Sequence, residues 1–264
     1  MLLSNKIAVV TGAAGGIGSA VARRFAAEGC DVVVADINQE GIDRTLSDVK
    51  KLGREGIAVQ TNVTKSDQAQ AMAEKAIEKF GRIDILVNAA GTLFDFADVS
   101  KRSITQIPEE EWDKLVEVNL KGCFLCCRAV TPYMLEKKYG KIVNFSTLGA
   151  VTPPAVAPHY NAAKAGVLGL TYDMASELGP KNITVNAVLP GPIQTSFYDK
   201  IMGTMTEEQK QARYAGMYAG APLQRMGTAD EVAGAVLFLS SELSSYVTGV
   251  GLLVSGGMPL TPRL

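Results

Sequence analysis

Short apolar runs alternate with longer stretches of helical periodicity along almost the whole chain. The runs are rich in Val and Ile and apolar on both faces, as Ile7–Val10 is, which is typical of strands buried between two layers. The stretches between them predict amphipathic helices. The predicted strands cover residues 7–10, 31–35, 57–60, 83–87, 141–145, 183–188 and 250–254, and the helices cover 17–28, a stretch ending near 52, 66–80, 109–136, 160–177 and 231–239.

This alternation predicts an α/β fold of the Rossmann type, with a doubly wound parallel sheet of about seven strands and helices on both faces. A length of 264 residues would allow one large domain or two small ones. Because no low-complexity linker interrupts the alternation, we expect a single domain over residues 1–264. The segment from about 190 to 222 breaks the pattern, and we interpret it as a mobile flap over the substrate.

Charge and composition narrow the class of partner. The 26 basic and 27 acidic residues leave a net charge of −1, which disfavours nucleic acid and anionic membranes as partners. No apolar run is long enough to span a membrane and the first residues lack a signal-peptide pattern, so we expect a cytoplasmic protein. A single histidine excludes multi-histidine metal sites, and no metal is expected. Cys123, Cys126 and Cys127 fall within one predicted helix, where we expect buried, reduced thiols.

A glycine-rich turn, Thr11-Gly12-Ala-Ala-Gly15-Gly16-Ile17-Gly18, follows the first predicted strand directly and opens the first helix. In this position glycines let the backbone approach a pyrophosphate, and the helix N-terminus offers N–H groups and a partial positive charge. The G-x-x-x-G-x-G spacing differs from G-x-G-x-x-G, and the lysine of a P-loop is missing. The turn therefore predicts a dinucleotide site.

Asp36 ends the second predicted strand, eighteen residues after Gly18. A carboxylate there can accept both hydroxyls of an adenine ribose and would repel a 2′-phosphate. Because Ile37 follows it and no Lys or Arg stands beside it, the sequence favours NAD over NADP. The alternative is an ordinary turn or helix-capping aspartate.

Tyr160 and Lys164 lie four residues apart in a predicted helix, so they share one face. A free tyrosine has a pKa of about 10, and a lysine cation and an oxidised nicotinamide both favour the phenolate. Such a tyrosine can accept the proton of an alcohol while hydride leaves its carbon. Since Tyr-x-x-x-Lys is common by chance, this interpretation depends on the motifs around it.

With the glycine turn, Asn88-Ala89-Ala90-Gly91, Asn119, Ser146-Thr147, Tyr160-x-x-x-Lys164 and Pro190-Gly191 in this order, the chain resembles the short-chain dehydrogenase/reductase (SDR) family over essentially its whole length. The resemblance implies that Tyr160 is the general acid/base, that Lys164 binds the nicotinamide ribose, and that Asn119 holds a relay water. It also implies a homotetramer. The implied cofactor contacts are Gly12, Gly15, Gly16, Ile17, Gly18, Asp36, Asn62, Val63, Asn88, Ala89, Gly91, Tyr160, Lys164, Pro190, Gly191, Ile193 and Thr195.

Four positions need separate comment. The substrate-orienting serine of the family is Thr147 here, with Ser146 as the alternative if the strand end is shifted by one residue. At the position where the family has an aspartate that touches adenine, this chain has Asn62. Ala89 replaces the second asparagine of the family's Asn-Asn-Ala-Gly motif. His159 could contact substrate or respond to pH, but we favour a surface or capping role.

Three predicted loops beyond the strand ends supply the substrate residues, and most of their side chains are apolar. The predicted contacts are Phe94, Thr147, Leu148, Val151, Tyr160 and Phe197. They favour a neutral hydrophobic secondary alcohol or ketone, although ordinary loop packing explains them too. Two alternatives stay open: a 3-oxoacyl-thioester reductase that uses NADPH, with Lys101, Arg102 or Arg213 near a phosphate, and a non-catalytic dinucleotide-sensing protein.

Overall fold

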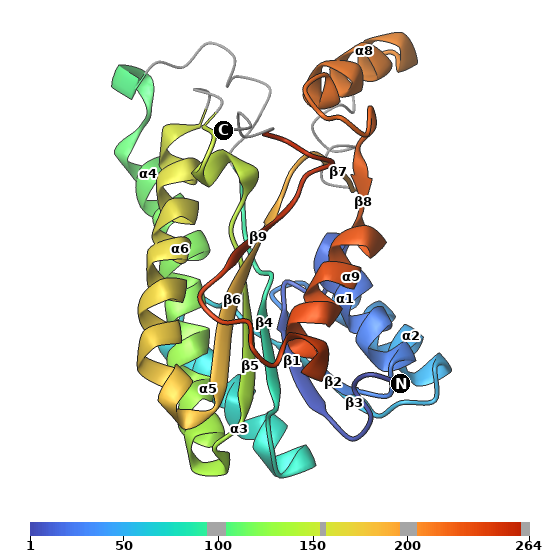
Figure 1. Ribbon diagram of the computed structural model, residues 1–264, viewed down its shortest axis with the longest axis vertical. Coiled ribbons are helices and arrows are strands. Elements are labelled where there is room, and N and C mark those ends of the chain that lie inside the picture. The colour runs from blue at the N-terminus through green and yellow to red at the C-terminus, as the bar shows by residue number, and fades with distance from the viewer. Residues whose placement is uncertain (94–103, 154–156, 196–204, 260–264) are drawn as a thin grey trace.

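A computed structural model of the chain describes residues 1–93, 104–153, 157–195 and 205–259. Its main sheet has seven strands in the order β3-β2-β1-β4-β5-β6-β9, and every neighbouring pair is parallel (Figure 1). The predicted doubly wound α/β fold is thereby confirmed. The strands are β1 (Ile7–Thr11), β2 (Asp31–Asp36), β3 (Gly56–Gln60), β4 (Ile85–Asn88), β5 (Gly140–Phe145), β6 (Ile183–Pro190) and β9 (Gly251–Val254).

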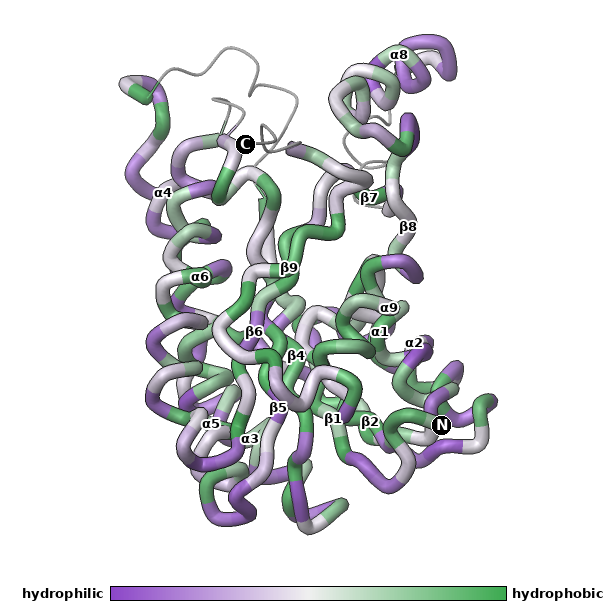
Figure 2. The backbone as a smooth tube through the Cα atoms, viewed as in Figure 1, coloured by the Kyte–Doolittle hydropathy of each residue, from purple (hydrophilic) through white to green (hydrophobic). Residues whose placement is uncertain are grey.

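Helices cover both faces of this sheet (Figure 1). Helices α1 (Gly16–Ala27), α2 (Gln39–Lys51) and α9 (Ala229–Ser240) cover one face, and α3 (Ser66–Phe80), α5 (Gly122–Lys137) and α6 (Pro158–Leu178) cover the other. Neighbouring strand residues enter opposite layers, since Val10 packs with α1 and α9 whereas Val9 packs with α3 and α5. This explains why the strands are apolar on both faces, and Figure 2 shows the hydrophobic strands enclosed by more polar helices.

The strand order reverses at β1, which lies between β2 and β4. Ligands of such sheets bind beyond the carboxyl ends of the strands, next to the reversal. That edge of the sheet holds Thr11, Asp36, Asn88 and Phe145, each the last residue of its strand. The candidate site therefore lies there.

The helix predicted over 109–136 is divided into three parts. Helix α4 (Glu109–Val116) continues through a π-helical turn, η3 (Glu117–Lys121), into α5. Asn119 is in the middle of this wider turn. Insertions of this kind in a helix occur frequently at functional sites.

The segment 190–222, which we interpreted as a mobile flap, contains regular secondary structure in its described part. Strand β7 (Ile193–Gln194) pairs with β8 (Gly227–Thr228), and α8 (Glu207–Tyr218) is a regular helix. The Thr206 hydroxyl accepts a hydrogen bond from the backbone N–H of Gln209. The Gln209 side-chain carbonyl accepts one from the backbone N–H of Thr206. This capping box begins the helix, and the Thr-x-x-Gln spacing was the signal that could have predicted it.

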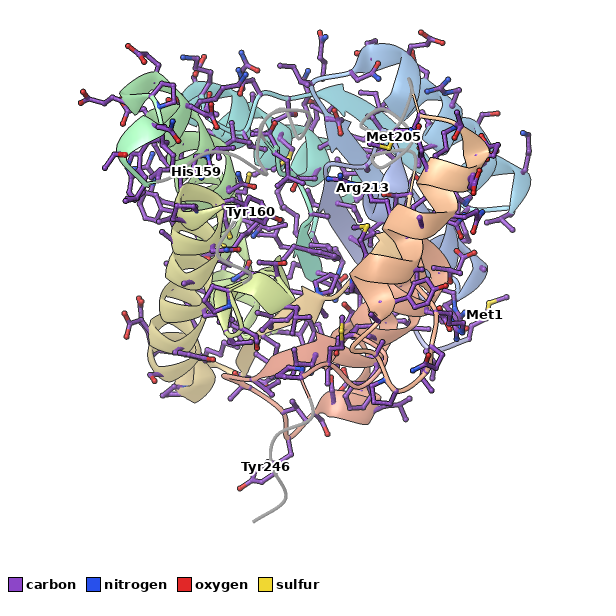
Figure 3. All side chains as sticks on the ribbon, turned by 90° about the horizontal axis from the view of Figure 1, so that it is seen from above. Met1, His159, Tyr160, Met205, Arg213 and Tyr246 are labelled. Carbon is purple, nitrogen blue, oxygen red and sulfur yellow. The ribbon has the colours of Figure 1, made fainter. Side chains whose placement is uncertain are left out.

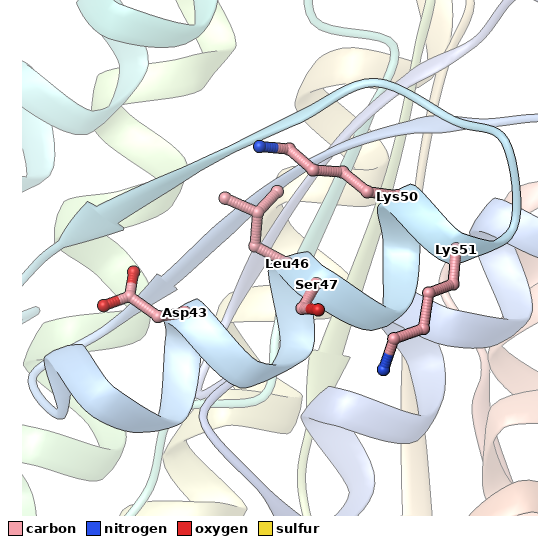
Figure 4. A pocket seen from close by; sticks show the side chains of 5 residues that line it. All are labelled: Asp43, Leu46, Ser47, Lys50 and Lys51. Atoms are coloured by element: carbon pink, nitrogen blue, oxygen red, sulfur yellow. The ribbon is translucent and has the colours of Figure 1, made fainter.

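All four cysteines are buried and reduced, as expected. Within the described residues, no helix is long and apolar enough to cross a membrane, and no cluster of metal-binding side chains occurs. An open hollow on the outer surface of α2 is lined by Asp43, Leu46, Ser47, Lys50 and Lys51 (Figure 4). It lies on the opposite face of the sheet from α6 and holds none of the predicted site residues.

Candidate active site

The glycine turn is shaped for close approach of another group. Gly12 has a φ of +68°, and a Cβ there would lie 2.6 Å from the Ala89–Ala90 peptide. A Cβ on Gly15, by contrast, would meet nothing within 4 Å. Helix α1 has no side-chain cap and no acidic residue in its first turn, so its first N–H groups and its partial positive charge are available to an anion. The turn therefore fits a dinucleotide pyrophosphate.

Asp36 is held next to this turn by two backbone donors. Its Oδ2 accepts from the N–H of Ala14 at 3.2 Å, and its Oδ1 accepts from the N–H of Asn38 at 3.0 Å. These bonds orient the carboxylate at the end of β2. A carboxylate placed here fits the hydroxyls of an adenine ribose.

The Asn88 side chain is turned into the protein rather than toward the cofactor side. It is 4% exposed, and its Nδ2 donates to Asn144 Oδ1 at 2.9 Å and to Cys127 Sγ at 3.1 Å. These bonds join β4 to β5 and α5. Any contact of this residue with a cofactor would therefore come from its main chain.

The loop after β3 is ordered by the residues expected near adenine. Asn62 Oδ1 accepts from the N–H and the hydroxyl of Thr64, at 3.0 and 2.9 Å. Val63 is buried, and a Cβ on Gly122 would lie 2.7 Å from its Cγ2. The side-chain carbonyl of Asn62 is thus engaged within the turn.

Tyr160 and Lys164 project from the first turns of α6, and Figure 3 shows Tyr160 at that end of the helix. Lys164 is 4% exposed, its Nζ donates to the Phe145 carbonyl at 2.9 Å, and the same Nζ lies 5.9 Å from the centre of the Tyr160 ring. Burial lowers the pKa of Lys164 to about 8. A cation held this close to the phenol favours the phenolate that proton abstraction needs.

Asn119 is fixed by three hydrogen bonds. Its Oδ1 accepts from the N–H of Thr92 at 3.2 Å, and its Nδ2 donates to the carbonyls of Thr92 at 2.9 Å and Leu115 at 3.0 Å. A Cβ on Gly91 would lie 2.9 Å from Asn119 Oδ1 and 3.5 Å from Lys164 Nζ. The structure therefore brings Gly91, Asn119 and Lys164 together.

Ser146 and Thr147 take different roles at the end of β5. Ser146 is buried, and its hydroxyl donates to the Lys164 carbonyl at 2.8 Å. Thr147 is partly exposed and follows in extended conformation. This arrangement favours Thr147 as the hydroxyl that meets substrate.

Two substitutions separate these roles. If the Thr147 hydroxyl binds the reacting oxygen, Thr147→Val removes that hydrogen bond, and we expect kcat/KM to fall about tenfold with the free energy of unfolding nearly unchanged. Ser146→Ala removes a buried hydrogen bond instead, so unfolding should become about 1 kcal/mol easier while kcat stays near wild type. Steady-state kinetics and urea unfolding of both variants check the assignment, and the reverse pattern would transfer the role to Ser146.

The remaining predicted residues are only partly accounted for. Gly191 donates its N–H to the Val254 carbonyl at 3.0 Å and Ile193 is buried in β7, which places Pro190 and Thr195 on either side of this stretch. Leu148 is partly buried and Val151 is exposed. Phe94 and Phe197 lie outside the described residues.

Two features of the site were missed from the sequence. The Tyr160 ring packs against a small cluster of Leu93, Leu115 and Ala157. The expectation that His159 lies at the surface was wrong, because it is 3% exposed and its Nε2 lies 2.8 Å from Glu111 Oε1. Leu115 and Glu111 are spaced for one face of α4, but only the packing of α4 on α6 shows that this face meets Tyr160.

This arrangement joins a dinucleotide-binding turn to a phenol with a buried ammonium behind it, which suits hydride transfer between a nicotinamide and a carbonyl or alcohol carbon. The chain belongs to the short-chain dehydrogenase/reductase family of oxidoreductases. Residues 12–259 match the family model described as Enoyl-(Acyl carrier protein) reductase.

Individual relatives are similar over their full lengths. A 3-oxoacyl-(acyl-carrier-protein) reductase of Thermotoga maritima is 39% identical over 258 residues, which cover 98% of this chain and 99% of the relative. A hydroxy(phenyl)methyl-succinyl-CoA dehydrogenase subunit of Thauera aromatica is 36% identical, with coverage of 98% and 99%. The crystal structure of levodione reductase superposes with a TM-score of 0.89 at 31% identity, covering 97% of this chain and 98% of that one.

Proposed function

We propose that this protein interconverts 3-oxoacyl and 3-hydroxyacyl thioesters with NAD(H) as the hydride carrier. The observation that carries the proposal is the full-length similarity to a 3-oxoacyl-(acyl-carrier-protein) reductase. A second relative named for a CoA thioester supports the same substrate class. The thioester, which was the alternative in the sequence analysis, therefore replaces the free alcohol or ketone as the favoured substrate.

A free ketone is the second candidate, because the fold superposes closely on levodione reductase. A non-catalytic sensor is disfavoured by the complete set of Asn119, Tyr160 and Lys164 in one place. Such a sensor would need neither the Tyr160 hydroxyl nor the Asn119 relay for its task.

In the proposed reaction the side chains act on the substrate oxygen and on the proton that it gains or loses. A bound nicotinamide would supply or accept the hydride. Thr147 donates a hydrogen bond to the carbonyl oxygen and orients it toward Tyr160. Tyr160 gives its hydroxyl proton to that oxygen during reduction and takes it back during oxidation. Lys164 stabilises the resulting phenolate, and Asn119, which lies close to Lys164, holds the water of the proton relay.

The substrate class is tested by comparing acetoacetyl-CoA with ethyl acetoacetate and a cyclic diketone, each with NADH. Ethyl acetoacetate is the matched control, because it keeps the 3-oxo group and lacks the carrier. We expect kcat/KM to be at least about tenfold higher for acetoacetyl-CoA, the equivalent of about 1.4 kcal/mol of added transition-state binding. A higher value for the cyclic diketone would favour the second candidate, and NADH binding without any turnover would favour a sensor.

The preference for NAD is part of the proposal and is carried by Asp36. We expect the Kd for NADH to be at least about tenfold lower than that for NADPH, because the oriented carboxylate would repel a 2′-phosphate. Asp36→Ala should reduce this ratio toward one and leave kcat with saturating cofactor unchanged. Titration of both cofactors measures this, and equal affinities in the wild type would refute the assignment.

The homotetramer stays a prediction of the family resemblance. Exposed apolar side chains on α5 and α6, Phe124 and Tyr172, support it as a packing surface. The mass of the assembly in solution will check it.

A further inference from the structure

His159 makes a buried contact with another helix immediately next to Tyr160. Its Nε2 lies 2.8 Å from Glu111 Oε1, and the Glu111 side chain is itself only 21% exposed. Because a carboxylate only accepts hydrogen bonds, Nε2 is the ring nitrogen that carries a hydrogen, and it donates a hydrogen bond to Glu111. Figure 3 shows His159 and Tyr160 together at the same end of α6. The bond therefore joins the turn that carries Tyr160 to α4.

That turn has no cap of its own. Helix α6 begins at Pro158, its preceding residue Ala157 makes no side-chain cap, and its first turn has no acidic residue. Uncapped first turns leave backbone donors without intrahelical partners and are prone to fray. Two anchors of this turn come from α4: the Glu111 bond, and Leu115, which belongs to the cluster that includes Ala157 and Tyr160.

The same helix leads directly to Asn119. Helix α4 continues into the π-helical turn η3, and Asn119 Nδ2 donates to the Leu115 carbonyl at 3.0 Å. Leu115 thus contacts the cluster around Tyr160 through its side chain and Asn119 through its backbone. Holding α4 against α6 therefore sets the position of Tyr160 relative to Asn119.

We propose that His159 and Glu111 form a positioning pair that fixes the Tyr160 hydroxyl for proton transfer. The pair acts through Tyr160 and touches no substrate itself. This inference rests on the proposed function, since it assigns Tyr160 the proton transfer. Small displacements of a catalytic group have large effects on rate, which is why a bond at the neighbouring residue matters for kcat.

The test uses His159→Leu, Glu111→Ala, the double variant and His159→Gln in the full-length protein. We expect each of the first two to lower kcat about tenfold with the Kd for NADH within about twofold of wild type. The double variant should be no slower than either single one, because both remove the same bond. His159→Gln should recover most of kcat, since its side-chain amide also donates to a carboxylate. Glu110→Ala, an exposed neighbour on α4, is the control and should match wild type.

Three kinetic outcomes would overturn the pair: a wild-type kcat in His159→Leu, multiplicative losses in the double variant, or an equal loss in Glu110→Ala. Thermal melting of each variant shows whether a loss of kcat comes from unfolding alone. If it does, recovery of kcat in His159→Gln decides whether the pair positions Tyr160.

If the wild-type protein turns over no thioester or ketone, the proposed function fails. The contact between α4 and α6 that the pair maintains is then tested by fluorescence. Trp112, the single tryptophan, follows Glu111 on α4 and is 39% exposed. Its emission should shift to longer wavelength in both single variants as α4 loosens from α6. Unchanged emission in both would overturn the link.

Discussion

Replacing Tyr160 by phenylalanine should lower kcat about 1,000-fold and leave the Kd for NADH within about twofold of wild type, because only the proton-transferring oxygen is lost. The ring keeps its packing against Leu93, Leu115 and Ala157, so the fold should not change. Stopped-flow reduction of acetoacetyl-CoA together with an NADH titration measures both quantities.

Tyr172→Phe is the matched control for this variant. Tyr172 lies on the same helix, α6, with its side chain exposed, and should lose its hydroxyl without consequence for kcat. If Tyr160→Phe kept more than about a tenth of the wild-type kcat, the proton would have to come from another group.

Lys164→Met should lower kcat at least about 100-fold and at the same time make the cofactor-free protein more stable. Loss of the cation removes the group that favours the phenolate of Tyr160. Burial lowers the pKa of Lys164 to about 8, so keeping it charged at pH 7 costs about 3 kcal/mol of folding free energy. The lost hydrogen bond to the Phe145 carbonyl offsets part of this, and we expect a net gain of about 1–2 kcal/mol.

The dependence of this gain on pH identifies its cause. The folded-state pKa of Lys164 lies below the unfolded value of about 10.4, so the unfolded chain binds more protons between about pH 8 and 10.4. The wild type should therefore gain stability relative to Lys164→Met as the pH rises through that window. Urea unfolding of both proteins at pH 7, 8.5 and 10 measures the difference. A difference that stays constant with pH would mean that packing, not the buried charge, separates the two.

The fold was predictable from the sequence because each strand carries its own signal. Runs such as Ile7–Val10 are apolar on both faces only when helices cover both sides of a parallel sheet. The placement of the central candidate residues was also predictable, since Tyr160 and Lys164 lie one helical turn apart and the glycine turn follows a strand directly.

Contacts between separate elements were not predictable in the same way. His159 is buried because α4 packs against α6. The residues next to His159 in the sequence do not indicate this packing. Asn88 occupies a position typical of cofactor contacts, yet β5 and α5 supply partners that turn its side chain inward. The substrate class could not be read from loop residues, because apolar loops suit an acyl chain and a free ketone equally well.

The short pairing of β7 with β8 has a consequence for how this chain can diversify. Ile193 pairs with Gly227, and the Gly227 N–H donates to the Pro192 carbonyl at 3.0 Å. The two ends of the segment that connects β7 to β8 are therefore held together just before α9 begins. The entropic cost of closing such a connecting segment grows only slowly with its length. The connection between β7 and β8 can therefore change in length at little cost to their pairing, while the main sheet and α9 keep their places.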